Sequence, residues 1–261
     1  MTWQVGVWDR MSHVYADEID KRFTDVVRHC VGRLHLEPGM AVLDLGTGTG
    51  AVALEVSALV GPDGIVTAVD LSPEMLRITS ERIEALGLAN IRVLEGRGEE
   101  IPADAGSFDA VAASLSLMYA IDREAVAREC ARVMRPGARL VAAVWGGPDD
   151  ADIVRFQQTA GSFAPEPPVA GVGPGALADA RPFVDQLAQA GIDSHVETEV
   201  VSFGFDDFES AWDVLAGVTT AQLSPERREE ARAAVRNLMW PDGDGPRTFS
   251  NKTQFIIGTR A

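Results

Sequence analysis

The sequence predicts an α/β fold in which a largely parallel sheet carries helices on both faces. The clearest indication is the stretch at residues 42–50, VLDLGTGTG, an apolar strand that ends at Asp44 and breaks into a glycine-rich turn. An apolar helical run follows at residues 51–59. Strand, turn and helix in this order form the first crossover of such a sheet, and strand-like and helix-like runs then alternate as far as residue 145.

The first half of the chain supplies most of the sheet. Two amphipathic helices are expected before it, at residues 8–16 and 19–34. Ser72 and Pro73 mark the start of a later helix, as its N-cap and its first helical residue. The remaining expected elements are strands at 65–70, 91–94, 108–115 and 139–145, a helix at 122–134 and a turn at 135–137.

The second half adds a closing strand and a small helical cap. Residues 164–175, APEPPVAGVGPG, are rich in Pro and Gly without a period, so we expect a mobile loop that serves as a substrate lid or as a passive connector. Helices are expected at 149–163, 183–190, 208–215 and 225–239, and strands at 196–203 and 254–259. Four aromatic residues of this half either line an acceptor pocket or, as the better interpretation of each, form the core of the cap: Phe205, Trp212, Trp240 and Phe249.

Length and composition exclude several classes of protein. The chain has 261 residues, 46% of them hydrophobic, and a formal net charge of −16. Nucleic acid and anionic membranes are therefore not expected as partners, because both need a basic surface. The sequence has no basic start followed by an apolar run and no apolar stretch of bilayer length, so we expect a cytoplasmic location.

The cysteines and histidines predict no metal site. Cys30 and Cys130 both lie in apolar helical patterns and are expected to be buried free thiols. The histidines do not cluster with cysteine or acid at the spacing of metal ligands. They are His13, His29, His35 and His195.

The glycine-rich turn predicts a nucleotide-like cofactor, and Asp44 indicates which one. Gly46, Gly48 and Ala51 satisfy the loose dinucleotide fingerprint, with Asp70 at a suitable distance for a ribose-binding acid. A carboxylate at Asp44, however, would repel the two phosphates of a dinucleotide. S-adenosylmethionine (SAM) carries no phosphate and presents an ammonium and a sulfonium, which the carboxylate would attract directly or through water.

The Asp-x-Gly-x-Gly-x-Gly pattern at residues 44–50 resembles motif I of the class I SAM-dependent methyltransferases. The chain is more closely similar to their small-molecule branch, related to the ubiquinone/menaquinone-biosynthesis methyltransferases, over residues 8–145. This resemblance implies a Rossmann-like sheet of seven strands, the last one antiparallel. The division that we expect is an N-terminal helical segment over the cofactor (1–36), a SAM-binding core (37–203), a helical cap (204–250) and the closing strand (251–261).

The resemblance also implies a set of cofactor-binding residues. Asp70 matches the acid that accepts both ribose hydroxyls, and Leu71 and Met75 are placed to cover the adenine, although Met75 is equally expected in the core. Trp8, Ser12 and Tyr15 match positions that fold over the cofactor, and strand four ends at Ser114 on the sulfonium side. Arg97 stands where the family usually has an adenine-binding acid, which leaves backbone contacts from Gly98 and Glu99. The glycine-rich loop contributes Asp44, Gly46, Thr47, Gly48 and Gly50.

The sequence offers only two candidates for a catalytic side chain. Many relatives carry histidines at the places of Met118 and Tyr119, and this chain has none there. Tyr119 could orient a substrate hydroxyl, or act as a base if its pKa were depressed. His13 is the other candidate base. Without a base, methyl transfer would depend on proximity and on the exclusion of water.

The resulting prediction is a SAM-dependent methyltransferase of secondary metabolism that acts on a small apolar or aromatic metabolite. Three alternatives stay open. The same fold could bind SAM and catalyse a rearrangement or a cyclisation, the protein could be an NAD-type oxidoreductase, or it could bind a ligand without catalysis. The acceptor atom is undetermined, and a homodimer is a further possibility.

Overall fold

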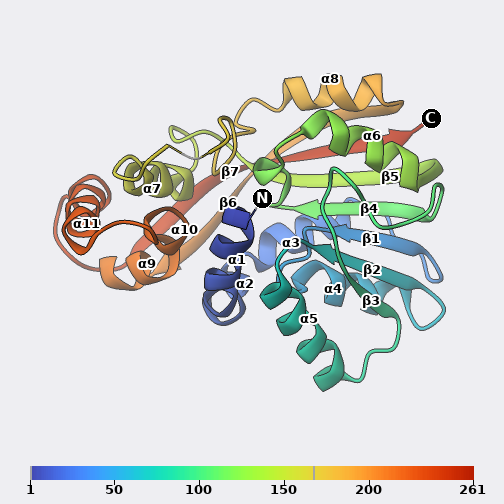
Figure 1. The fold of residues 1–261 in the computed structure, drawn as a ribbon, viewed down its shortest axis with the longest axis horizontal. Helices are drawn as coiled ribbons and strands as arrows, with labels where there is room; N and C mark the ends of the chain where they lie inside the picture. Colours follow the sequence, from blue (N-terminus) through green and yellow to red (C-terminus); the bar gives the residue numbers. More distant parts are fainter. Residues whose placement is uncertain (1, 167) are drawn as a thin grey trace.

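The computed structural model describes residues 2–166 and 168–261, and its centre is one sheet with the strand order β3-β2-β1-β4-β5-β7-β6 (Figure 1). The first five strands are parallel, whereas β7 is antiparallel to both of its neighbours, β5 and β6. The strands are β1 (Ala41–Leu45), β2 (Ile65–Asp70), β3 (Ile91–Glu95), β4 (Phe108–Ser114), β5 (Met134–Trp145), β6 (Ile192–Phe205) and β7 (Arg247–Arg260).

Helices surround the sheet and build the cap beside it. In Figure 1, α3 and α4 lie behind the strands, α6 lies in front of them and α8 lies above them at the top of the view, while α5 packs beside β2 and β3. These helices are α3 (Thr24–Gly32), α4 (Ala51–Val60), α5 (Pro73–Leu86), α6 (Arg123–Val133) and α8 (Arg181–Gln189). The cap contains α7 (Asp152–Gly161), α9 (Phe208–Leu215), α10 (Gly217–Thr220) and α11 (Pro225–Met239). The predicted fold class, a Rossmann-like sheet with an antiparallel last strand, is confirmed.

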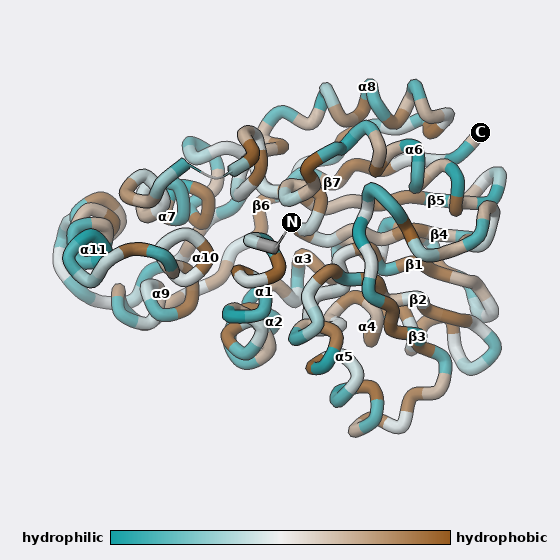
Figure 2. The backbone as a smooth tube through the Cα atoms, viewed as in Figure 1, coloured by the Kyte–Doolittle hydropathy of each residue, from teal (hydrophilic) through white to brown (hydrophobic). Residues whose placement is uncertain are grey.

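The central strands form because they are apolar on both faces. The apolar side chains of β1 from Val42 on and those of β5 from Leu140 to Val144 are buried, as a parallel sheet covered on both sides requires. Figure 2 shows these strands as largely hydrophobic, whereas much of α11 is hydrophilic. Asp44 is the exception in β1, since its carboxyl group is 1% exposed among apolar neighbours.

The last strands are longer than predicted. Strands were expected at 196–203 and 254–259, but β6 and β7 pair continuously from Ile192↔Arg260 to Phe205↔Arg247. Many side chains of β6 are exposed because it is the edge strand, so its hydrophobic alternation is weak. The expected turn at 135–137 lies within β5, where the pairing with β4 shifts register.

The expected helix at 19–34 is interrupted. Tyr15–Ile19 forms a π-helical turn (η1), followed by the short α2 (Asp20–Arg22) and by α3. The break occurs at Phe23, whose ring packs against Trp145 and Phe203 with centroid distances of 5.4 and 5.6 Å. Before this break, α1 (Thr2–Val14) packs against α5 and α10. In Figure 1, α1 lies at the end of the sheet toward which the arrow of β4 points.

The cap has its own aromatic core. Phe205, Trp212, Trp240 and Phe249 are all at most 6% exposed, and the Phe249 ring contacts those of Phe205 and Trp240. None of the four lines a described cavity. Their burial places them in the core of the cap.

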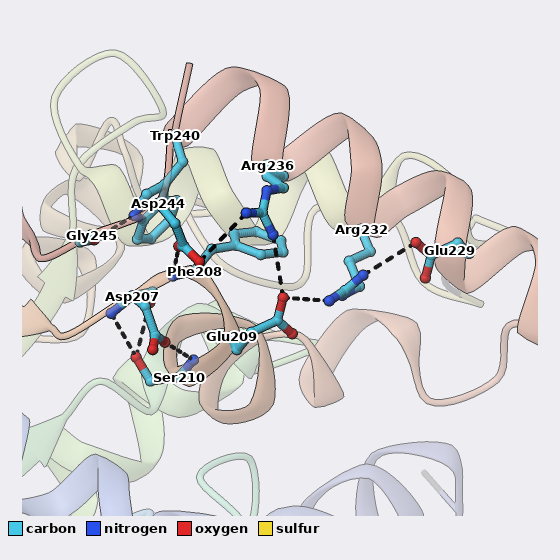
Figure 3. A network of polar contacts seen from close by, with 10 residues as sticks. All are labelled: Asp207, Phe208, Glu209, Ser210, Glu229, Arg232, Arg236, Trp240, Asp244 and Gly245. Carbon is cyan, nitrogen blue, oxygen red and sulfur yellow. Dashed lines mark hydrogen bonds and ion pairs between the residues drawn. The ribbon is translucent and has the colours of Figure 1, made fainter. Parts of the chain in front are cut away.

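A polar network ties α9 to α11 over this core (Figure 3). The Glu209 carboxylate pairs with Arg232 and Arg236, and both guanidinium groups lie over the Phe208 ring. The Asp244 carboxylate accepts the Phe208 backbone N–H at 3.1 Å and also pairs with Arg236. The network fixes the geometry of the cap far from the end of β1.

Candidate cofactor site

Two cavities lie where the parallel strands end. The larger has a volume of about 750 Å³ and the smaller about 130 Å³. Together they are of a size suited to one cofactor. Five residues line both cavities, so the two adjoin: Gly46, Asp70, Leu71, Ser116 and Tyr119. Ligands of open α/β sheets bind at this edge, beyond the carboxyl ends of the strands.

The glycine-rich loop forms the floor of the smaller cavity. Gly46, Thr47 and Gly48 line it, and Gly46 has a φ of +77°. A Cβ atom at Gly46 would lie 2.4 Å from the Ser116 Cβ, so only glycine allows the two loops to meet. Gly50 differs from the expectation because it lines neither cavity. It precedes α4 and faces Thr79 of α5, 2.9 Å from its added Cβ, which makes it a packing residue.

Asp44 lies beneath this loop and not in the cavity wall. Its Oδ2 accepts a hydrogen bond from the Thr47 hydroxyl at 2.6 Å. Its Oδ1 is buried and has no hydrogen-bond partner within residues 2–166 and 168–261. Burial raises the pKa of this carboxyl to about 7, although the Thr47 hydroxyl opposes the shift. The Asp44 carboxyl therefore does not contact a ligand in the cavity directly. It influences the site through Thr47 of the loop above it.

Asp70 stands at the junction of the two cavities. Its two oxygens accept the backbone N–H groups of Gly48 and Ser72, each at 2.9 Å. Each oxygen keeps a further lone pair, so the carboxylate can still accept two hydroxyl donors side by side. Burial raises the pKa of Asp70, and the bonds from Ser72 and Gly48 oppose that rise.

Three aromatic rings form one wall. The Trp8 ring meets Tyr15 and Tyr119 edge to face, with centroid distances of 5.8 and 4.7 Å. All three line the smaller cavity, which places α1 over it. Ser12, expected beside them, is buried but bonds the Asp9 carbonyl and lines neither cavity.

Tyr119 is in the site, but its chemistry differs from that of a base. Burial raises its pKa well above 10, and the nearby Tyr15 adds to the shift. A depressed pKa was the condition for base catalysis, so the structure contradicts that role. The phenol stays protonated and can donate a hydrogen bond.

His13 corrects the other catalytic expectation. Its side chain is exposed and lines none of the described cavities. Met11 and Tyr15 turn inward, and a residue two positions from each lies on the opposite face of a helix. The histidine therefore faces away from the site.

The larger cavity is built by the segment after β3. Gly98 and Glu99 line it, and the Glu99 Oε1 accepts the backbone N–H groups of Ile121 and Asp122 at 2.9 and 3.3 Å. Arg97 also lines this cavity and pairs with Glu100. Leu71 faces both cavities. Met75 and Ser114 line only the smaller one.

Among the residues that line the smaller cavity, Asp20, Thr49, Leu115 and Ser116 have notable geometry or bonding but were not predicted for the site. Leu115 has a φ of +56°, an unusual conformation for a non-glycine residue, directly after β4. Asp20 and Thr49 share a hydrogen bond of 2.6 Å, and Ser116 donates to the Leu45 carbonyl at 2.7 Å. Asp20 lies in a helical pattern, Thr49 within the glycine-rich motif and Leu115 at the end of the expected strand 108–115, but none of these patterns singles the residue out for the site.

The Pro/Gly-rich loop reaches the same region. Gly173 donates its N–H to the Met118 carbonyl at 3.0 Å, and Arg123 donates to the carbonyls of Met118 and Gly171. Residue 167 of this loop lies outside the described residues. These bonds attach the loop to the short 3₁₀ turn η2 (Leu117–Tyr119) that carries Tyr119.

No group of three or more His, Cys, Asp or Glu side chains at residues 2–166 and 168–261 is placed to hold a metal ion. In the same part of the chain, every helix is too short or too polar to cross a bilayer. Cys30 and Cys130 are buried free thiols, as predicted.

Comparison with known proteins places the site in a family. Residues 5–148 match the model of the ubiE/COQ5 methyltransferase family. Nocamycin O-methyltransferase of Saccharothrix syringae is 36% identical over 134 residues, which are 51% of this chain and 48% of that protein. The ubiquinone/menaquinone biosynthesis C-methyltransferase UbiE of Pasteurella multocida is 32% identical over 137 residues, 52% of this chain and 50% of that protein. The chain thus spans about half the length of the curated relatives that it matches.

The fold of the whole chain has counterparts among solved structures. The YcgJ protein of Bacillus subtilis superposes with a TM-score of 0.66 at 19% identity, over 90% of this chain and 98% of that one. At this identity the likeness concerns the fold alone. The family match extends from α1 through β5 and includes the glycine-rich loop, Asp70 and Tyr119. The chain therefore belongs to the ubiE/COQ5 methyltransferase family.

Proposed function

We propose that this protein transfers a methyl group from SAM to a small apolar or aromatic metabolite. The position of Asp70 carries the proposal, because its carboxylate lies where the two cavities join. An adenosine in the larger cavity and an amino-acid end in the smaller one would bring the ribose hydroxyls to Asp70. The buried, unpartnered Oδ1 of Asp44 beneath the smaller cavity favours a cationic group above it.

The residues of the chain would hold and shield the reactants. When bound, SAM supplies an electrophilic methyl group on a sulfonium. Trp8, Tyr15 and Tyr119 close the wall beside it and exclude water, which favours the direct displacement. The protonated Tyr119 would donate a hydrogen bond to an oxygen of the acceptor and orient it. No described cavity-lining side chain is a histidine, so proximity supplies most of the rate.

We propose a small-molecule acceptor and no nucleic-acid partner, since a net charge of −16 disfavours binding to a polyanion. The names of the relatives support this class, since they refer to nocamycin, ubiquinone and menaquinone. We further propose the domain division given above, with α7 joined to the cap because it packs against α10 and α11, the loop at 164–175 as a lid and a cytoplasmic location. The bonds from Gly173 and Arg123 to the Tyr119 turn support the lid, and the free thiols fit a reducing compartment.

A second candidate is a SAM-binding protein of the same fold that catalyses a rearrangement or a cyclisation. One observation favours it, namely that burial raises the pKa of both phenols that line the smaller cavity, Tyr15 and Tyr119, so neither is suited to act as a base. Such a protein would bind the product S-adenosylhomocysteine yet leave SAM unconsumed while it converts a substrate.

Calorimetric titration with S-adenosylhomocysteine and, separately, with NADH tests the cofactor. We expect micromolar binding of the first and no heat from the second. NADH binding alone would overturn the proposal and favour an oxidoreductase. Consumption of SAM in an acceptor screen with phenols and quinols then separates methyl transfer from the second candidate.

The Asp70→Ala variant tests the assignment of the ribose acceptor. Two lost charge-assisted hydrogen bonds should weaken S-adenosylhomocysteine binding by about 30-fold or more. Asp63→Ala, at an exposed turn, is the matched control and should bind like the wild type. Equal affinity of the Asp70 variant and the wild type would remove Asp70 from the site.

A further inference from the structure

The smaller cavity is acidic. Its only charged lining residues are Asp20 and Asp70, and Asp44 lies beneath its floor. Asp70 already accepts two backbone N–H groups and faces both cavities. Of these two cavities, Asp20 lines only the smaller one. A ligand group that enters here meets negative charge, which favours a cation.

Asp20 is held by one of its two oxygens. Its Oδ2 accepts from the Thr49 hydroxyl and from the Arg82 guanidinium, both at 2.6 Å. Its Oδ1 has no hydrogen-bond partner in the described part of the chain. The carboxylate is therefore oriented by two short bonds and retains an unused acceptor.

Arg82 joins this acid to the loops around it. Besides Asp20, the guanidinium donates to the carbonyls of Thr49 and Ala16, both at 2.9 Å. Ala16 belongs to the π-helical turn η1, which begins with the cavity residue Tyr15. π-helical turns are rare and occur often at functional sites, and here one brings Asp20 to the glycine-rich loop.

We propose that Asp20 binds the α-ammonium group of the amino-acid end of the cofactor, and that Arg82 and Thr49 position its carboxylate. This assignment rests on the proposed function, since it places the amino-acid end in the smaller cavity. The Asp20 Oδ1 accepts an N–H of the ammonium. Arg82 does not line the smaller cavity; together with Asp20 it lines a third cavity of about 320 Å³.

Two ligands that differ only in the amino-acid end test the assignment. S-adenosylhomocysteine carries the ammonium, and 5′-methylthioadenosine lacks the whole amino-acid part. In calorimetric titrations, Asp20→Asn should bind the first about tenfold or more weakly and the second within about twofold of the wild type. The asparagine keeps an oxygen for Thr49 and Arg82, so the fold should persist, which thermal unfolding of the free protein checks.

A deaminated analogue of S-adenosylhomocysteine completes a thermodynamic cycle, in which the Asp20 carboxylate and the ligand ammonium are removed separately and together. It should bind the wild type as weakly as S-adenosylhomocysteine binds Asp20→Asn, and the same substitution should not weaken it further. Additive losses would show that Asp20 and the ammonium act independently, and would overturn the assignment.

Arg82 has a matched control on its own helix. Among the described residues, Arg77 pairs only with Glu74 and Glu81 of α5, so Arg77→Ala should bind both ligands like the wild type. Arg82→Ala should lower the affinity for S-adenosylhomocysteine more than that for 5′-methylthioadenosine. Arg82→Lys should restore part of the affinity for S-adenosylhomocysteine. An equal loss of affinity for both ligands would show that Arg82 has only a structural role. A wild type that binds neither ligand would overturn the proposed function itself, whereas a wild type that binds both and an unaffected Asp20→Asn would overturn only this inference.

Discussion

Asp44 shows how one residue sets the character of the site. A carboxyl group that is 1% exposed within an apolar strand is costly to ionise, and burial raises its pKa from 3.8 to about 7. The sequence marks this residue because a carboxylate at the end of the strand disfavours the phosphates of a dinucleotide. The structure adds that one of its oxygens has no described partner. A ligand cation above the loop would offset part of this cost.

Asp44 should make the folded state less stable as the pH rises. Its folded pKa exceeds its unfolded value, so the native state binds more protons between pH 3.8 and about 7. The free energy of unfolding therefore falls with rising pH across this window and levels off above it. The Asp44→Asn variant lacks this loss. Between pH 3.8 and about 7, the free energy of unfolding of this variant should therefore rise by roughly 2 to 4 kcal/mol relative to that of the wild type.

Urea unfolding of both proteins over this pH range measures the effect in the absence of ligand. Asp63→Asn, at an exposed turn, serves as the control and should follow the wild type at every pH. Parallel curves for the wild type and Asp44→Asn would show that the carboxyl titrates normally.

At the scale of elements, the β6–β7 pair connects the sheet to the cap. Both strands have 14 residues and run beyond the sheet into the aromatic cluster. Phe205 and Phe249 belong to these strands, whereas Trp240 follows α11. Their rings pack together with centroids 5 to 6 Å apart. The cap is thus continuous with the core of the sheet, and its aromatic residues stabilise it.

Phe249→Ala distinguishes a cap core from an acceptor pocket. The ring is completely buried, so its removal should lower the free energy of unfolding by about 3 to 5 kcal/mol. The affinity for S-adenosylhomocysteine, measured where the variant remains folded, should stay within about twofold of the wild type, because the residue lines no described cavity.

Leu238→Ala is the control, since that side chain is 49% exposed and should contribute about 0.5 kcal/mol or less. If Phe249→Ala were as stable as the wild type but lost acceptor turnover, Phe249 would line a substrate pocket. Chemical unfolding and a turnover assay at one temperature provide both measurements.

At the scale of the whole molecule, the charge of −16 acts on any charged ligand that approaches. SAM carries a net charge of about +1 at neutral pH, because its ammonium and sulfonium outweigh its carboxylate. S-adenosylhomocysteine has no sulfonium and is net neutral. The two ligands make the same contacts otherwise, so they separate the field of the protein from the contacts of the site.

The affinity for SAM should therefore depend on salt more steeply than that for S-adenosylhomocysteine. From about 10 mM to about 0.5 M salt, we expect SAM to lose about two- to threefold more affinity than its product. Titrations of both ligands at the two salt concentrations measure this difference. An equal salt dependence would show that the acidic surface does not assist cofactor binding.

The sequence by itself determined the order and type of most elements and predicted the class of cofactor. The glycine-rich loop, the N-cap at Ser72 and the helices α9 and α11 are local features, because propensity, capping and short-range periodicity decide them. The bounds of α9 and α11 agree with the prediction residue by residue. The family resemblance extended this local pattern to a sheet of seven strands.

Only the tertiary structure decided which side chains meet in the cavities. His13 turned out to face solvent and Gly50 to face α5, while Asp20 came to the smaller cavity through a π-helical turn that has no marker in the sequence. The positive φ of Leu115 and the lengths of β6 and β7 likewise depend on strands distant in sequence. The physical reason is common to all of them. The face that a residue presents and the partners that it meets are set by packing between elements, and this packing leaves no local pattern in the chain.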